Sequence, residues 1–522
     1  MINTIEKQSN IWENFEVSNN DIEFIFSRLF DVETPTNTND LVKILIQERI
    51  RLEKLRLEGI ERSKGDIYLP KDDFKIGQKL TFPALNFKSG EVKAIREGNN
   101  PELGDFSIIT VDFPSGSPKE FASNLSEHQL NNLNLILDEE ADLNFDDIFG
   151  SHKKKISKLL IDKLNSNQDL VQIAGFWFPR SLLIDINIGY LNLAEAVLEV
   201  SEGGPLSTPS IIEQIELPTD SNIMLTEFSL NLALQEDNRF DEVGPAGKTL
   251  WFLHRCEPDN VRKTPKFLDP AEQKNFDNTK YSNYLSQMNA GVFDELEYTK
   301  QDANEKSHDV TISTIYPHIV SGTLPLSSNL ENLFPTAYES PRIRFTFVDG
   351  DTQKKFAGWV IREKKYVYGL EEWYKKNEVL PGSLVHIKQG KIPGEVIVSI
   401  GKKRPTREWV RTASLSLEGK ISFSMTKQLI STEFDDRMAI AIANRDQIEK
   451  LWDRYLNVPS EKLVSNFVRE LAKLNPQGHV HAQELYAAFN IVKRVSPSYV
   501  LFLLENSSEI EHLGDLYFRI KI

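Results

Sequence analysis

The apolar residues of this chain change their spacing several times along its 522 residues. Residues 41–55 follow the spacing of an amphipathic helix, residues 74–113 alternate like short strands between turns, and residues 464–492 return to helical spacing. A chain that switches period in this way builds several small cores rather than one large one. Its length predicts about three or four domains, and the positions of the switches raise that number to about five.

A single cysteine, Cys256, limits the chemistry open to the chain. It excludes an internal disulfide framework and any zinc or iron–sulfur site built from several cysteines. With only His254 and Glu257 beside it and no further acid in view, we expect Cys256 to be packed or exposed rather than a nucleophile. The N-terminus lacks the pattern of a signal peptide, and the sequence has no run of about 18 apolar residues. We therefore expect a cytoplasmic protein with no membrane partner and no cofactor.

The C-terminal residues 446–522 predict short helices followed by two strands. Helical spacing ends at Gly478, resumes over 485–492, and is followed by a third helix that starts at Ser496-Pro497. The stretch HVHAQELYAAFNIVKRVSPSYVLFLLENSSEIEHLGDLYFRI resembles winged-helix domains of the HARE type. These domains are associated with transcription and chromatin proteins, including the delta subunit of bacterial RNA polymerase.

Residues 190–255 show the same plan, so 166–260 is expected to be another winged-helix domain. The segment that follows Thr226 is ambiguous between helix and strand, and residues 240–252 predict two strands around a Gly-rich turn. Neither 226–237 nor 497–506, the two candidate recognition segments, contains Lys or Arg. A helix that reads DNA normally presents basic or amide side chains to base edges. We therefore expect both domains to contact proteins or to act as scaffolds.

Residues 66–130 are predicted to form a small β-barrel. The phrase FKIGQKLTFPALNFKSGEVKAI resembles the opening of Tudor-like and CarD-like barrels, which are interaction modules. An acidic run at 138–147 and Lys153-Lys154-Lys155 follow. We interpret them as a solvated linker and a helix edge.

Charge is segregated along the chain, which has 61 basic and 77 acidic residues and a net charge of −16. Residues 341–412 hold sixteen Lys and Arg against eight Asp and Glu, a net charge of +8, which leaves −24 for the rest. The basic segment therefore suits phosphate binding although the whole protein is acidic.

The strands of this basic segment alternate, with Ile343, Phe345 and Phe347 on one face. The sequence RIRFTFVDGDTQKKFAGWVIREKKYVYGLEEWYKKNEVLPGSLVHIK resembles the DNA-binding pseudobarrel family of plant transcription factors and restriction-enzyme effector domains. The Gly-Trp pair of that family appears here as Glu372-Trp373, and its Gly-Asp pair as Gly382-Ser383. The resemblance implies a barrel over 315–415 whose loops and strand ends clamp a DNA major groove.

The candidate nucleic-acid contacts are the basic residues of this segment and one amide, because Lys and Arg release counterions and Arg reads guanine edges. An alternative stays open, in which the basic face docks onto an acidic domain of the same chain. The resemblance implies Arg342, Arg344, Lys354, Lys355, Lys364 and Lys365, and the candidate set also includes Lys375, Lys376, Asn377, Arg404, Arg407 and Arg411.

Two loose matches to a magnesium-dependent nuclease occur. Such a site needs an Asp and a Glu-x-Lys on an adjoining strand to hold Mg²⁺ and position water. This spacing arises readily by chance in a chain rich in Glu and Lys. The candidate residues are Asp73 with Glu91 and Lys93, and Asp351 with Glu363 and Lys365.

Two further motifs are better explained by structure than by chemistry. The run 244–249 (GPAGKT) has two residues between its glycines, whereas a phosphate-binding loop needs four. His479, His481 and Glu484 could be drawn as a metal cluster. We expect them instead to be a strand residue, a helix cap and an exposed helix residue.

The sequence thus predicts a multidomain α+β protein: a small β-barrel, two winged-helix domains and a β pseudobarrel, joined by helices and linkers. The expected function is that of a non-enzymatic DNA-associated protein in transcriptional or nucleoid regulation, with winged helices on partners such as RNA polymerase. A magnesium-dependent, restriction-related nuclease and a protein-interaction adaptor without nucleic acid are the alternatives. The expected domains are a helical region (1–65), the Tudor-like barrel (66–130), a linker and helix (131–165), a winged helix (166–260), a linker (261–314), the pseudobarrel (315–415), a connector (416–445) and the C-terminal winged helix (446–522).

Overall fold

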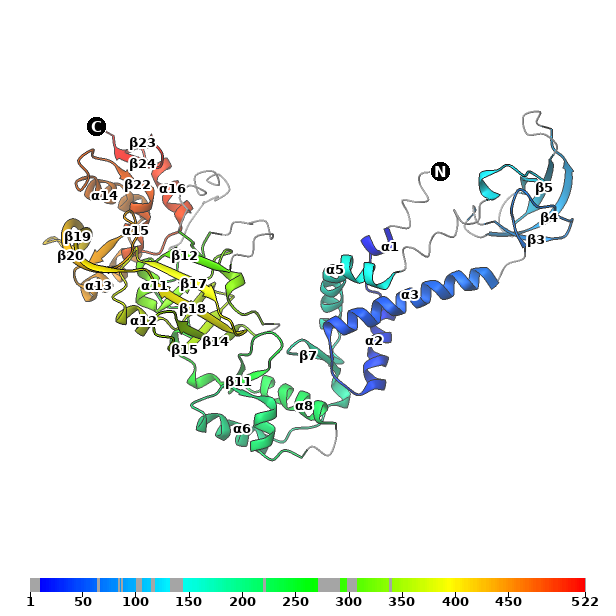
Figure 1. Ribbon diagram of the computed structural model, residues 1–522, viewed down its shortest axis with the longest axis horizontal. Helices are drawn as coiled ribbons and strands as arrows, with labels where there is room; N and C mark the ends of the chain where they lie inside the picture. Colours follow the sequence, from blue (N-terminus) through cyan, green and yellow to red (C-terminus); the bar gives the residue numbers. More distant parts are fainter. Residues whose placement is uncertain are drawn as a thin grey trace. The chain divides into compact units, whose positions relative to one another are not determined.

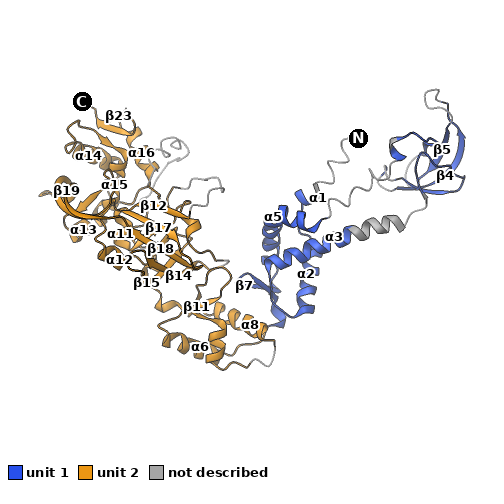
Figure 2. Cartoon of the chain, in the orientation of Figure 1, with its two compact units in different colours: residues 1–183 blue, residues 184–522 orange. Residues whose placement is uncertain are grey.

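The protein is a mixed α and β chain that divides into two compact units, residues 1–183 and residues 184–522 (Figure 2). No helix among the described residues is long and apolar enough to cross a membrane. Parts of the expected N-terminal region and of the two expected linkers lie outside the described residues. The computed structural model describes residues 10–62, 66–82, 85, 88–99, 106–113, 118–131, 144–218, 222–270, 292–297, 308–337 and 340–521.

The first compact unit contains a three-stranded sheet with the order β1-β8-β7, packed against three helices (Figure 1). Its core includes Ile25, Leu45 and Leu160, which are buried on α2, α3 and α5. The short strand β1 directly precedes α3, the second helix. It pairs with β8, the second strand of the hairpin that follows α5. In chain order the elements are α2 (Asn19–Val32), β1 (Thr36–Asn37), α3 (Thr38–Arg62), α5 (Phe145–Asn165), β7 (Leu170–Ile173) and β8 (Phe176–Pro179).

A five-stranded sheet is inserted in the sequence between α3 and α5, with the order β2-β3-β4-β5-β6. The Tyr68 hydroxyl donates to the Ala122 carbonyl at 2.6 Å and so links the chain after β2 to β6. The aromatic rings of Tyr68, Phe82 and Phe121 meet inside this curled sheet. The strands are β2 (Asp66–Ile67), β3 (Lys79–Phe82), β4 (Lys88–Glu97), β5 (Ser107–Asp112) and β6 (Lys119–Ser123).

The second compact unit repeats the plan of three helices and a hairpin twice, with the strand orders β9-β11-β10 and β22-β24-β23. The ambiguous segment after Thr226 is helical, as part of α8. The earlier copy consists of α6 (Ile188–Val200), β9 (Leu206–Ser207), α7 (Thr208–Gln214), α8 (Ile223–Glu236), β10 (Phe240–Glu242) and β11 (Leu250–Leu253). The later copy consists of α14 (Ser460–Ala472), β22 (Val480–His481), α15 (Ala482–Val492), α16 (Pro497–Asn506), β23 (Ile510–Gly514) and β24 (Tyr517–Ile520).

We call these three assemblies the first, second and third helix–hairpin units, in chain order. They share one register: Thr36 lies opposite Trp177, Leu206 opposite Trp251, and Val480 opposite Phe518. The first unit was not expected from the sequence, because the inserted sheet separates its second helix from its third.

A hydrogen bond at this shared position distinguishes the units. Trp177 Nε1 donates to Thr38 Oγ1 at 3.0 Å, and Trp251 Nε1 donates to Thr208 Oγ1 at 3.2 Å. In the third unit Phe518 and Ala482 stand at the two positions, so the donor and the acceptor are absent together. The indole donor and the hydroxyl acceptor are thus either both present or both absent, so neither is buried without a partner.

A seven-stranded sheet lies in sequence between the second and third helix–hairpin units, with the order β12-β17-β18-β14-β15-β16-β13. Its β14 and β18 are parallel neighbours, and α11 (Tyr316–Ser321) and α12 (Glu371–Lys376) accompany it. The strands are β12 (Asp309–Ser313), β13 (Thr323–Pro325), β14 (Arg342–Asp349), β15 (Lys355–Ile361), β16 (Tyr366–Tyr368), β17 (Leu384–Gln389) and β18 (Glu395–Ile400).

A long hairpin follows this sheet, made by β19 (Lys402–Leu415) and β20 (Ile421–Thr432), with β21 (Ile440–Ile442) beside β19. The sequence predicts that residues 402–415 belong to the pseudobarrel and that residues 416–445 form a connector. The two strands instead pair along almost their whole length. The segment 416–445 is therefore built into a sheet, and α13 (Arg445–Leu456) leads from it to the third helix–hairpin unit.

Candidate nucleic-acid interface

One face of the β19–β20 hairpin exposes a tryptophan among cations. Arg407 pairs across the strands with Leu429, and Trp409 pairs with Lys427. Trp409 is 61% exposed and Leu429 is 68% exposed, and Lys427 Nζ lies 5.6 Å from the Trp409 ring centroid. We call Arg407, Trp409, Lys427 and Leu429, together with the exposed Arg404 in the irregular stretch of β19 just before them, the cationic hairpin face.

The opposite side of the hairpin is anchored in the protein. Val410 and Ile430 are buried against Ala439, and the hydroxyls of Thr412 and Thr426 lie 2.6 Å apart across the strands. Because side chains alternate between the faces of a strand, this buried side fixes which side chains point outward. The exposed ring is therefore presented by a supported sheet rather than by a loop.

The charges of the hairpin are only partly neutralised. Lys402 pairs with Asp351 at 2.6 Å, and Lys403 pairs with Glu408 at 2.7 Å. The hydrogen bond from Lys403 lowers the pKa of the Glu408 carboxyl. Arg404 and Arg407 are exposed and form no ion pair with any residue that the structure describes. Their guanidinium groups are thus available to an external anion.

Arg342 and Arg344, predicted as DNA contacts, instead face the second helix–hairpin unit. Arg342 Nη1 lies 2.5 Å from Asp241 Oδ2 and 3.4 Å from Glu257 Oε2. The Arg344 guanidinium lies 5.4 Å from the Phe252 ring centroid and 5.9 Å from that of Trp359. Burial lowers the pKa of Arg344. These contacts agree with the alternative interpretation, in which the basic face docks onto another part of the chain.

The remaining predicted contacts do not gather at one place. Lys354 is exposed before β15, and Lys365 is half-buried in the turn after it, with a φ of +54°. Arg411 is held by Glu484 of α15 at 2.6 Å. The others have local partners: Lys355 with Glu395 at 2.5 Å, Lys364 with Glu363 at 3.3 Å, Lys375 with Glu371 at 2.9 Å, Lys376 with Asp349 at 3.6 Å, and the Asn377 amide with the Trp373 carbonyl at 2.9 Å.

Arg404 and Arg407 are among the contacts predicted from the sequence, whereas Trp409, Lys427 and Leu429 are not. A signal was present, because Trp409 alternates in phase with Arg407 and Arg411. A tryptophan on the charged phase of a strand is either exposed or at an interface. Lys427 was out of reach, since its strand was interpreted as a connector.

A cluster of two acids and a histidine, of which only Glu257 is buried, lies where β14 meets the second helix–hairpin unit. Ligand atoms of Asp241, His254 and Glu257 lie within 4.8 Å of one another. The Glu257 side chain is buried, and burial together with the nearby charge of Asp241 raises its pKa to about 8. Arg342 already supplies a positive charge at this point. The cluster therefore fits an internal ion pair better than a metal centre. Asp241 Oδ2 lies 2.9 Å from His254 Nδ1, and Asp241 is an acidic partner that the sequence around Cys256 did not reveal.

The third helix of the third helix–hairpin unit is enclosed by the protein. Arg494, three residues before its start, is fully buried and reaches Asp294 Oδ1 at 2.5 Å and Glu295 Oε1 at 2.8 Å. Glu297 accepts a hydrogen bond at 2.8 Å from the Ser498 amide at the start of α16. The helix thus offers its surface to residues 292–297 rather than to a ligand.

The two proposed nuclease sets do not converge. Asp351 precedes β15 whereas Glu363 follows it, and a seven-residue strand spans about 20 Å. Asp73 follows Asp72, whose carbonyl accepts a hydrogen bond from the Ser123 hydroxyl. Ser123 lies opposite Ser107, so Asp73 is near the first residue of β5. Glu91 faces Asp112 at the other end of that strand. Neither set forms the compact metal site that such an enzyme requires.

The other two motifs are structural. In the run 244–249, the amide of Gly244 donates to Glu242, that of Ala246 to Thr336, and that of Lys248 to Pro245, so these donors are not free for phosphate. His481 caps α15 by accepting from the Gln483 amide, and burial lowers its pKa to about 4. This is the helix cap expected from the sequence.

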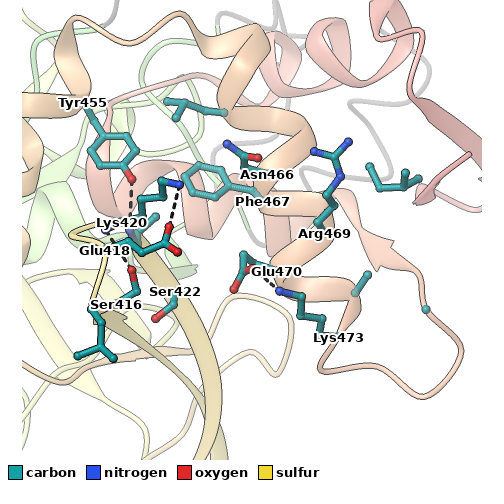
Figure 3. A pocket seen from close by; sticks show the side chains of 16 residues that line it. Ser416, Glu418, Lys420, Ser422, Tyr455, Asn466, Phe467, Arg469, Glu470 and Lys473 are labelled. Atoms are coloured by element: carbon teal, nitrogen blue, oxygen red, sulfur yellow. Dashed lines mark hydrogen bonds and ion pairs between the residues drawn. The ribbon is translucent and has the colours of Figure 1, made fainter.

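A cleft of about 1010 Å³ opens between the β19–β20 turn and α14 (Figure 3). Its charged side chains are already paired: Lys420 with Glu418, Lys473 with Glu470, and Arg469 with Glu509. Because each cation has a nearby carboxylate, the cleft has no net field that would select an anion. The cationic hairpin face is therefore the stronger candidate for nucleic acid.

The chain matches no family model, and comparisons with curated proteins and with solved structures give no match.

Proposed function

We propose that this chain is a non-enzymatic DNA-associated protein of transcription or nucleoid organisation, and that the cationic hairpin face is its contact with DNA. Trp409 would stack on an accessible base, while Arg404, Arg407 and Lys427 would hold the neighbouring phosphates. Stacking of a base on an aromatic ring combined with cations along the backbone is the usual basis of single-strand binding. We therefore assign a single strand, or a locally opened duplex, to this face.

The observation that carries the proposal is the exposed tryptophan beside two unpaired arginines on a supported sheet. Burying a large aromatic ring stabilises a protein, so its exposure on a rigid strand suits a partner. The surrounding charges favour a phosphate backbone over an apolar partner, because Arg404, Arg407 and Lys427 would lose hydration against an apolar surface. The acidic remainder of the chain would make this contact local and sensitive to salt.

In this proposal the second and third helix–hairpin units are winged helices, and the seven-stranded sheet is the pseudobarrel that the sequence resembles. The order of helices and strands in these units supports that assignment. The units would contact protein partners such as RNA polymerase. The apolar residues Leu193 and Val200 of α6 are exposed, which favours such a protein contact over a purely solvated helix.

The test is fluorescence anisotropy of the full chain with a labelled single strand at about 50 mM and about 200 mM salt. Trp409→Ala should weaken binding about 5- to 150-fold, because stacking contributes about 1–3 kcal/mol per base. The double substitution Arg404→Ala and Arg407→Ala should lower the slope of log affinity against log salt by about 1.4 for two single-strand phosphates.

Lys391→Ala is the matched control, because this lysine is exposed on the turn between β17 and β18, whereas β19 follows the other end of β18. It should leave both the affinity and the salt slope unchanged. The proposal is wrong if the wild-type chain does not bind at about 50 mM salt. It is equally wrong if Trp409→Ala binds as tightly as the wild type, and a stable protein partner without any DNA binding would favour the adaptor.

A further inference from the structure

The third helix of the first helix–hairpin unit differs from its two counterparts in charge. Helix α5 contains five lysines and three aspartates, whereas α8 and α16 contain no Lys or Arg. All three helices occupy the same place, directly before the hairpin of their unit. A difference in charge at one position of a shared plan points to a difference in what that position contacts.

Two of the five lysines of α5 lie on its exposed stripe. Ile148, Ile156, Leu160 and Leu164 form the buried side of the helix. At 100° per residue, Ser151, Lys154 and Lys158 lie on the opposite side. This side faces away from the core of the first helix–hairpin unit, and these three side chains are exposed.

The two lysines of the stripe, Lys154 and Lys158, differ from their neighbours Lys153 and Lys155, whose side chains contact other parts of the protein. Lys155 donates to the Glu13 carbonyl, and Lys153 lies 5.0 Å from the centroid of the Phe149 ring. Lys154 and Lys158 are one turn apart, and neither forms an ion pair with a residue that the structure describes. Their ammonium groups are therefore available to an external anion.

A glycine widens the space beside these lysines. Gly150 lies within α5, and a Cβ atom built on it would meet nothing within 4 Å. Glycine within a helix lowers its stability relative to alanine, and here no neighbouring atom requires it. The bare backbone at Gly150 allows a close approach by a ligand that lies along the stripe.

The acidic residues lie towards the ends of the stripe. Asp146 and Asp147 occupy the first turn, where they stabilise the positive end of the helix dipole, and Asp162 is in the last turn. They limit the cationic region to the middle of the helix. A contact there would span about two turns.

We propose that the middle of α5, centred on Lys154 and Lys158, binds the phosphates of duplex DNA. A helix with its side chains is about 10–12 Å wide and fits a major groove of about 12 Å. The stripe carries no exposed aromatic ring, so it lacks the stacking surface that a single strand requires. This surface lies in the first compact unit and is separate from the cationic hairpin face, so it does not rest on the function proposed above.

The test uses the full chain, a labelled duplex, and the double substitution Lys154→Ala and Lys158→Ala. Two lost phosphate contacts should lower the salt slope for duplex DNA by about 1.8 and weaken binding at least tenfold at about 0.1 M salt. Binding to single strands should change far less. Lys154→Arg with Lys158→Arg should retain duplex affinity, since both cations remain.

The double substitution Lys450→Ala and Lys462→Ala is the control, because it removes two exposed helix lysines from the second compact unit and gives the same change in net charge. If this control weakens duplex binding as much, only net charge matters and the proposal fails. It also fails if the α5 variant binds duplex like the wild type, or if the wild type binds no duplex at about 50 mM salt. Loss of an acidic protein partner with duplex binding unchanged would likewise overturn it.

Two further variants separate this proposal from the others. Gly150→Ala should raise the melting temperature and weaken duplex binding, a combination that loss of folding does not produce. In the background of Arg404→Ala, Arg407→Ala and Trp409→Ala, the α5 effect should persist in full. If it disappears there, the two surfaces are not independent and the α5 site is wrong. A loss confined to the hairpin variant would leave the hairpin proposal standing and refute this one.

Discussion

The first and third helix–hairpin units use the same position of the same plan in opposite ways. In the first unit, α5 exposes Lys154 and Lys158 to solvent. In the third unit, α16 is buried, and Arg494, three residues before its start, is enclosed with Asp294 and Glu295. The order of helices and strands therefore does not determine whether a helix reads a ligand or fills a core. Exposure and charge decide it, as expected when one fold carries unrelated sites.

The second helix–hairpin unit adds a third use of the plan. Its hairpin, rather than its third helix, contacts the rest of the protein, with Asp241 on Arg342 and Phe252 beneath Arg344. The basic strand β14 is thereby occupied by the chain itself. The β19–β20 hairpin and helix α5, in contrast, both carry exposed cations that have no ion pair among the described residues.

The largest effect is expected from replacing Arg494, the buried cation of the third helix–hairpin unit. Arg494→Leu should lower the unfolding free energy of the third unit by about 3–5 kcal/mol, because Asp294 and Glu295 would remain buried without a cation. The measurement is hydrogen exchange of the amides in α15 and α16, which reports the local opening free energy.

The control for this substitution is Arg469→Leu, which removes a surface cation that lies 2.6 Å from Glu509. An exposed pair contributes about 0–1 kcal/mol, so exchange should change little. Lys158→Ala in α5 should likewise leave the amides of the first unit protected. Equal losses at Arg494 and Lys158 would contradict the distinction between an interior and a surface helix.

The hydrogen bond between Trp177 and Thr38 tests the difference between the first and third helix–hairpin units at one shared position. Thr38→Ala should destabilise the first helix–hairpin unit by about 1–3 kcal/mol, because it leaves the buried indole N–H of Trp177 unpaired. Trp177→Phe removes the same hydrogen bond, but the half-buried Thr38 hydroxyl keeps its bond to the Gly175 carbonyl at 3.3 Å. The double substitution reproduces the Phe and Ala of the third unit. It should therefore cost less than the sum of the single changes by about 0.5–1.5 kcal/mol. Hydrogen exchange at α3 and β8 measures all three, and strict additivity would show that the pair is not coupled.

The sequence predicted the local elements of the second and third units because their helices, caps and turns are contiguous. Leu485 and Val492 mark one helix of the third unit, and Ser496-Pro497 marks the start of the next. The first unit was missed because pairing between Thr36 and Trp177 joins segments on either side of an inserted sheet. Long-range pairing leaves no periodic trace in the sequence, so α5 was interpreted as a linker and helix edge.

The candidate site was predictable in part, for a related reason. Net charge located the basic segment and named Arg404 and Arg407, because charge adds up along the chain whatever the fold. Net charge did not show that Arg342 and Arg344 face the second helix–hairpin unit. Their partners there, the carboxylate of Asp241 and the ring of Phe252, lie about 100 residues away in sequence. Charge density predicts a cationic region, whereas tertiary contacts decide which cations remain free.

The contact between the second unit and β14 should depend on pH through Glu257. Its pKa is raised from 4.5 to about 8 by burial and by Asp241, so the folded protein keeps a proton that the unfolded chain releases. The stabilisation is complete below pH 4.5 and is lost as the pH rises towards 8. Glu257→Gln stays neutral at every pH. Its melting temperature should therefore rise relative to that of the wild type between pH 5 and pH 9, by about 2–4 °C for each kcal/mol of stability that the wild type loses. Glu213→Gln, at an exposed position of α7, should run parallel to the wild type. If Glu257→Gln also runs parallel, Glu257 is ionised in the fold, and Arg342 rather than a proton balances the buried carboxylates.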